Sequence, residues 1–364
     1  AIVQKQLVEV DKKLKEEDLL DGISLTSVLP GPVAVNTIAY VGYRLRGISG
    51  AIVAFIGIII PSFLLVILLS WLYFSYGNIP AVKNIFSGIT PAITALIVTV
   101  AIGMTRKTVK VPIQWVMCLL AALFLIFIGG FTVTFLLLVG SGVAGAFLFR
   151  QPAGTDTMST GKNFIGRKQL IISGIVLLLL LCTLLWGGQS PEAPKDIQIL
   201  STFSGISLTL FGGGYVVIPA LHELFVENLK WLTSAEFADG IAIGQITPGP
   251  IFITAAFIGY KVGGVLGALL ATVAIFTPPA ALTVLLSRFV EVLNHSSVVK
   301  AAMKGIRAAV IGMIFASAIT IGQTITLSVA AAAIFVVTFF ISFKYTISPI
   351  YLILGAGVAG FILF

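Results

Sequence analysis

The chain has 364 residues, 58% of them hydrophobic and only 10% charged, with a formal net charge of +8. An ordinary soluble domain is about 25% charged, so the composition excludes a soluble globular protein and predicts an all-α, polytopic membrane protein. Most basic residues fall in short loops, which indicates cytoplasmic loops rather than a nucleic-acid surface. The two cysteines and two histidines are isolated, so we expect no disulfide framework, metal site, cofactor or catalytic pair of an enzyme.

The first half begins with an amphipathic segment followed by apolar helices. Residues 1–18 have apolar positions at helical spacing, which predicts a helix lying either on the membrane surface or as a soluble cap. Residues 19–29 and 33–43 flank Pro30-Gly31-Pro32, and each is about half of the ~20 residues that span a bilayer. They form either a re-entrant hairpin or one broken helix, which leads into a tight turn at Gly47. Further helices are expected at residues 48–76, 82–104, 113–128 and 131–149.

A polar linker at residues 150–168, followed by a solitary apolar helix at residues 169–186, divides the chain. We therefore predict a first repeat (1–149), a linker with one extra transmembrane helix (150–196) and a second repeat (197–364).

The second half opens with an apolar helix at residues 197–218 that is broken at the Gly-rich residues 211–214. An amphipathic segment follows at residues 219–232. Thr233 and Glu236 then form a capping-box pattern that starts the helix before Pro248. The remaining helices are expected at residues 251–260, 265–286, 298–322, 325–343 and 347–364.

The two halves are copies of one another. Pro248-Gly249-Pro250 follows Pro30-Gly31-Pro32 by 218 positions, and Asp239 follows Asp21 by the same offset. Later matches, at offsets of 217 or 215, include Gly42, Gly47, Gly50, Pro61, Gly88, Gly140 and Gly145 of the first copy. Two copies of one fold in a membrane chain suggest a transporter with its site at the repeat interface. In this register the first copy's Gly-rich element is expected upstream of Ala1.

The basic residues also predict how the copies are oriented. In the first half, the basic residues near 44–46, 106–110 and 150–168 fall on one side of the membrane if each intervening helix crosses once. In the second half this bias reverses. If the Gly-rich and Pro-Gly-Pro breaks both cross the membrane or both re-enter it, one repeat plus the helix at residues 169–186 makes an odd number of crossings, so we predict inverted repeats.

Each Pro-Gly-Pro sequence predicts a broken or re-entrant helix. Proline lacks an N–H and clashes with the carbonyl four residues before it, and it disfavours a helical residue before it. Pro32 and Pro250 would then lie in the first turn of a new helix. Irregular backbone at membrane depth survives only where protein buries it or where it lines a wet cavity. We therefore expect both breaks to belong to a binding site, although kinks and close packing contacts are the simpler reading.

A longer series of motifs resembles a known family. In the second half these are Phe211-Gly212-Gly213-Gly214-Tyr215, Trp231-Leu232, Asp239-Gly240, the segment 244–250 and Gly259-Tyr260. Over nearly the whole chain they are similar to the signature of the chromate ion transporter family, long two-domain type. One departure is Ser27, which stands where the second copy has Gln245. The resemblance implies export of chromate from the cytosol of bacteria or archaea across the plasma (inner) membrane, with sulfate as a look-alike.

Chromate and sulfate are tetrahedral dianions, and a helix N-terminus offers free N–H groups and partial positive charge. Two such helix ends could meet at mid-membrane, with glycine leaving the backbone open to close approach. The predicted substrate-binding residues are Pro30, Gly31, Pro32, Asn36, Gly212, Gly213, Gly214, Gln245, Thr247, Pro248, Gly249, Pro250, Thr254 and Arg307. The polar side chains of this set would add neutral hydrogen bonds.

Three charged residues have two readings each. Arg307 lies in an apolar helix and either supplies positive charge to the dianion or extends to the interface. Asp21 and Asp239 either carry a coupling proton or act as polar caps. Coupling to protons is not obligatory, because at about 100 mV, inside negative, outward movement of a dianion gains roughly 4.6 kcal/mol.

The competing functions stay open at this point. They are a sulfate or other oxyanion uptake transporter, an anion channel of the same fold, a membrane enzyme and a structural membrane subunit. The expected partners are a small oxyanion and the lipid bilayer, with a homodimer as a further option.

Overall fold

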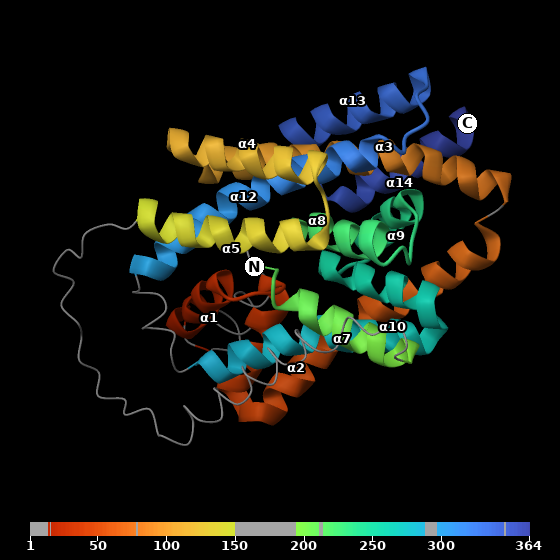
Figure 1. Ribbon diagram of the computed structural model, residues 1–364. Helices are drawn as coiled ribbons and strands as arrows, with labels where there is room; N and C mark the ends of the chain where they lie inside the picture. Colours follow the sequence, from red (N-terminus) through yellow and green to blue (C-terminus); the bar gives the residue numbers. More distant parts are fainter. Residues whose placement is uncertain are drawn as a thin grey trace, which may run out of the picture.

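The computed structural model describes residues 14, 16–77, 79–149, 194–210, 214–287, 297–345 and 347–364. Across these ranges the regular structure is helical and no strand occurs, which confirms the all-α prediction (Figure 1). The α-helices are α1 (Glu16–Val28), α2 (Val33–Tyr76), α3 (Pro80–Thr108), α4 (Pro112–Phe127), α5 (Phe131–Leu148), α7 (Lys195–Ser207), α8 (Val217–His222), α9 (Ser234–Ile246), α10 (Thr254–Leu286), α12 (Ser297–Gly322), α13 (Val329–Lys344) and α14 (Pro349–Leu363). The 3-10 turns η2 (Gly214–Val216) and η4 (Ile251–Ile253) and the π-helix η3 (Glu223–Asn228) lie between them.

Four described helices are long and apolar enough to cross a membrane, namely α2, α3, α10 with its preceding turn, and α12. Four shorter apolar helices, α4, α5, α13 and α14, accompany them. The second part of α2 exposes large apolar side chains such as Ile52, Ile56 and Leu64. Such a surface suits contact with lipid, and the chain is a multi-pass membrane protein.

Both α2 and α10 are interrupted at a glycine. Gly47 has φ 64° and ψ −150°, and Gly264 has φ 61° and ψ −148°. Only glycine adopts this part of backbone space readily. The chain folds back there, so that Gly42 packs directly on the backbone of Gly50, and the same contact recurs 217 positions later. The tight turn predicted at Gly47 is confirmed.

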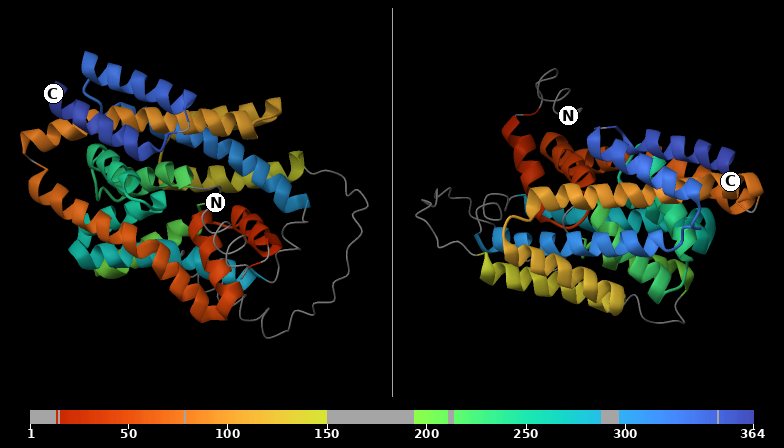
Figure 2. Two further views of the ribbon diagram at one scale, coloured as in Figure 1. Left: turned by 180° about the vertical axis from the view of Figure 1, so that it is seen from behind. Right: turned by 90° about the horizontal axis from the view of Figure 1, so that it is seen from above.

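The two repeats are interlocked. Gly88 of α3 packs against Gly360 of α14, and Gly305 of α12 packs against Gly145 of α5, with an added Cβ 2.6 and 2.8 Å from the facing Cα. Figures 1 and 2 show α5 beside α12 and α3 beside α14. Because small residues let helix backbones approach closely, each repeat packs one long helix on the last helix of the other. The inversion of the repeats stays a prediction.

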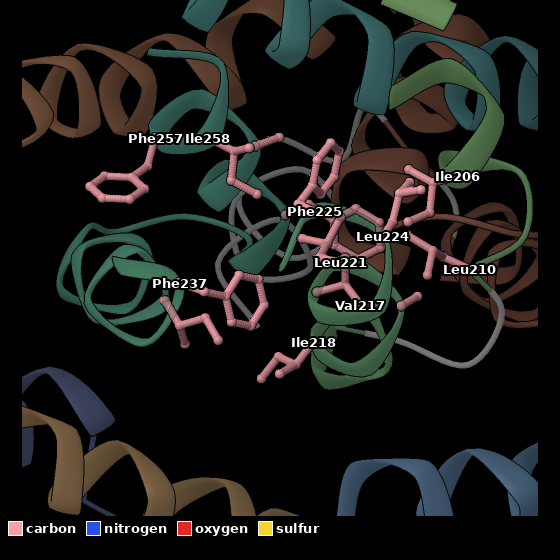
Figure 3. Packing of buried hydrophobic residues seen from close by; sticks show 14 of the residues in the cluster. Ile206, Leu210, Val217, Ile218, Leu221, Leu224, Phe225, Phe237, Phe257 and Ile258 are labelled. Atoms are coloured by element: carbon pink, nitrogen blue, oxygen red, sulfur yellow. The ribbon is translucent and has the colours of Figure 1, made fainter. Parts of the chain in front are cut away.

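The largest buried cluster includes α8, in which every residue is buried. Figure 3 shows Val217 and Leu221 of α8 together with Phe225 in this cluster. The segment predicted to be amphipathic at residues 219–232 is fully buried in its first half, where even His222 and Glu223 are enclosed. Its second half keeps polar residues at the surface, among them Glu227 and Lys230.

Several predictions fall outside the described residues. These are the amphipathic segment before residue 14, the linker and helix at residues 150–186, and the first part of the Gly-rich break, which contains Gly212 and Gly213. The repeat boundaries at residues 149 and 196 stay predictions. Pro32 and Pro250 are N-caps of α2 and η4, one position earlier than predicted. A proline at this position still fits, because an N-cap needs no helical N–H.

Candidate functional site

The two Pro-Gly-Pro breaks border one cavity of about 430 Å³. Its lining residues come from both repeats and are all uncharged: residues 32–34, 214–215, 244–245, 247–252 and 348–350. The described lining therefore offers an anion backbone N–H groups and neutral side chains, and no fixed cation.

The backbone amides of the two glycines at the breaks are hydrogen-bonded within the fold. The Gly31 N–H donates to the carbonyl oxygen of Leu210 at 2.7 Å, and the Gly249 N–H donates to the carbonyl oxygen of Thr247 at 2.9 Å. Buried backbone groups are nearly always paired, and here a carbonyl from the other repeat satisfies Gly31. Neither amide remains available to a ligand.

The available amides lie two or three positions after each glycine. The first N–H groups of a helix have no intrahelical acceptor. Among the described residues, no hydrogen bond engages the amides of Val33, Ala34, Ile251 or Phe252. All four residues line the cavity. The site therefore keeps paired helix starts, one from each repeat.

Both glycines pack against the other repeat. Gly31 is buried, has φ 95° and lies against the ring of Pro279. Gly249 lies against Ser62, where an added Cβ would be 2.6 Å from the serine Cβ. Gly249 also lines the cavity, whereas Gly31 and Pro30 do not.

Gln245 is a predicted donor on the cavity lining whose amide hydrogens the described fold does not use. The Tyr215 hydroxyl donates to Gln245 Oε1 at 3.0 Å. This bond fixes the amide orientation and leaves Nε2, a buried atom with no hydrogen-bond partner in the described part of the chain. Both side chains belong to residues that line the cavity.

Three other predicted donors already donate a hydrogen bond to a backbone carbonyl of the protein itself. Thr247 lines the cavity, but its hydroxyl donates to the Gly244 carbonyl at 2.8 Å. The Thr254 hydroxyl donates to the Ile251 carbonyl, and Asn36 Nδ2 donates to the Pro30 carbonyl at 3.0 Å. Thr254 and Asn36 do not line the cavity. The Thr247 and Asn36 side chains satisfy carbonyl groups at the breaks, whereas the Ile251 carbonyl also accepts the backbone N–H of Thr254.

The predicted charged residues also lie outside the cavity lining. Arg307 is partly buried on α12, and Asp21 is exposed on α1. Asp239 is 9% exposed on α9, and its carboxylate accepts a 2.7 Å hydrogen bond from the Tyr73 hydroxyl of α2. Asp239 thus joins the two repeats at a distance from the cavity.

One part of the cavity was missed from the sequence. Ser348, Pro349 and Ile350 form the start of α14 and line the wall with the two breaks. Serine followed by proline is a typical helix start. The sequence signal was present, but nothing in it placed this helix end beside the other two.

Comparison with known proteins identifies the family of the chain. A family model described as "Chromate transporter" matches residues 1–146 and 197–361. A chromate transport protein of Cupriavidus metallidurans is 28% identical, over 99% of this chain and 86% of the relative. A chromate transport protein of Pseudomonas aeruginosa is 27% identical, over 100% and 87% respectively. An uncharacterized transporter of Methanocaldococcus jannaschii is 30% identical, over 94% and 84%. No solved structure matches the chain.

Proposed function

Because the chain belongs to the chromate transporter family, we propose that it exports chromate from the cytoplasm across the inner membrane of a prokaryote. The observation that carries the proposal is the meeting of helix starts from both repeats at one uncharged cavity. Free N–H groups at helix N-termini suit anions. Without a fixed cation, they bind a dianion weakly enough for release.

The proposed transport cycle uses donors of the protein to bind the anion and gradients across the membrane to drive its export. The dianion lies between the amides of Ala34 and Ile251, with Gln245 Nε2 as a side-chain donor. Export is driven by the membrane potential, by a proton gradient or by both, because an inside-negative potential of about 100 mV favours outward movement of two negative charges by roughly 4.6 kcal/mol. Sulfate has the same charge and shape and competes for the cavity.

Flux measurements in proteoliposomes test this function. Chromate and sulfate transport are measured in both directions, with an imposed potential, an imposed pH gradient or neither. We expect saturable chromate flux, and we expect the imposed potential to accelerate it toward the electrically positive side of the membrane. Flux of sulfate without chromate flux would instead support a sulfate transporter, and equal, non-saturating flux of several anions would support a channel.

A further inference from the structure

Two consecutive ionisable residues are buried away from the cavity. Glu223 is 6% exposed and His222 is 2% exposed, and neither lines the cavity. Ionisable groups buried in a membrane protein are costly and are usually functional. No step described so far uses either residue.

The Glu223 carboxylate bridges the two repeats. It accepts a hydrogen bond from the backbone N–H of Gly130, which is the N-cap of α5 in the first repeat. Gly129 and Gly130 have φ of 63° and 90°, a turn that glycine permits. A carboxylate at a helix N-terminus makes a charge-assisted bond and is stabilised by the helix dipole. The strength of this link therefore depends on the charge of Glu223.

Glu223 is also connected to the cavity through a short, buried segment. It begins the π-helix η3, nine positions after Gly214, and fully buried α8 lies between them. Figure 1 shows α8 next to the start of α5. π-helical turns often occur at functional sites. A shift at Glu223 would pass along α8 to Tyr215, which holds Gln245 in the cavity.

The surroundings leave the charge of Glu223 uncompensated by an ion pair. His222 Nε2 has no hydrogen-bond partner among the described residues, and its ring lies edge-on to Phe237. Glu227 is the other acid of η3 and is exposed. The α4–α5 turn and α5 carry no ionisable side chain. On α12, which packs against α8, Lys304 and Arg307 form no ion pair with Glu223 in the described structure.

We propose that Glu223 is the proton-binding group of the transport cycle, an inference that rests on the proposed transport function. Uptake of one proton converts the carboxylate to the neutral acid, which weakens its hold on the Gly130 N–H and releases the start of α5 from η3. Loss of that proton restores the link. Proton binding and the geometry of the cavity are thereby coupled.

The test compares Glu223→Gln with Glu227→Gln, a matched control in the same π-helix. Three quantities are measured in proteoliposomes: chromate exchange without gradients, chromate accumulation driven by a pH gradient, and proton movement reported by a trapped pH dye. We expect Glu223→Gln to keep exchange within about twofold of wild type, while its pH-driven accumulation and proton movement fall at least tenfold. Glu227→Gln should behave as wild type, and Glu223→Asp should retain partial coupling.

Several outcomes would overturn the inference. They are pH-driven accumulation retained in Glu223→Gln, loss of exchange in a folded Glu223→Gln protein, and wild-type chromate transport without proton movement. Absence of chromate flux from the wild-type protein in all three assays would instead refute the proposed transport function.

Discussion

Gly31 lies against the ring of Pro279, so that the break of the first repeat is held by α10 of the second. The reciprocal contact, Gly249 against Ser62, holds the second break on α2. Pro279 and Ser62 are themselves repeat equivalents, 217 positions apart. The two halves of the cavity are thus positioned by each other, and a change at one contact should affect both transport and stability.

A methyl group at Gly249 should overpack this contact. We expect Gly249→Ala to destabilise the protein by about 1–3 kcal/mol and to reduce chromate flux, because the added Cβ would lie 2.5 Å from Ser62 Oγ. Combining it with Ser62→Gly should restore much of the loss. Thermal unfolding in detergent measures the effect. The control is Gly57→Ala on α2, the helix that carries Ser62, because no atom lies within 4 Å of a Cβ added at Gly57. Equal melting temperatures for the Gly249 and Gly57 variants would contradict the packing argument.

Gln245 should control anion affinity. Gln245→Leu keeps the approximate size but removes the Nε2 donor, so we expect KM for chromate to rise about tenfold, equivalent to about 1.4 kcal/mol. Gln245→Glu places a negative charge beside the dianion and should lower flux much further. Initial rates over a chromate concentration series provide KM, with exposed Gln323→Leu as the control. A Gln245→Leu KM equal to that of wild type would argue against this role.

The sequence predicted the local features of the site and missed its long-range partners. Proline chemistry placed both breaks, and the capping box at Thr233 and Glu236 is confirmed, because both depend on neighbouring residues. The acceptor of the Gly31 amide, Leu210, lies 179 positions away along the chain. No sequence rule identifies such a partner, so the sequence could not show which amides of the break are already engaged. Ser348 was missed for the same reason.

The hydrogen bond between Tyr73 and Asp239 should contribute to stability across the repeats. Tyr73→Phe leaves a buried carboxylate without this donor, which typically costs about 1–3 kcal/mol. We expect a lower melting temperature and partial recovery in Tyr73→Phe/Asp239→Asn, since a neutral amide is less costly to bury. Tyr76→Phe, at an exposed position of the same helix, is the control. If Tyr73→Phe and Tyr76→Phe have the same melting temperature, the hydrogen bond has no measurable effect on stability.

Arg307 lies outside the cavity lining, and its replacement should leave substrate affinity nearly unchanged. We expect KM of Arg307→Gln to stay within about twofold of wild type, a difference below about 0.5 kcal/mol. The same chromate concentration series measures it. A tenfold rise in KM with unaltered protein stability would place this guanidinium in the binding path.

The position of the bound anion decides whether the paired helix starts form the binding site. Anomalous diffraction at the chromium absorption edge, from crystals grown with chromate, would locate it directly. We predict a chromium peak inside the cavity, with chromate oxygens about 3 Å from the amide nitrogens of Ala34 and Ile251. A bound chromate elsewhere, such as beside Arg307, with the cavity between the two Pro-Gly-Pro breaks left empty, would contradict the account.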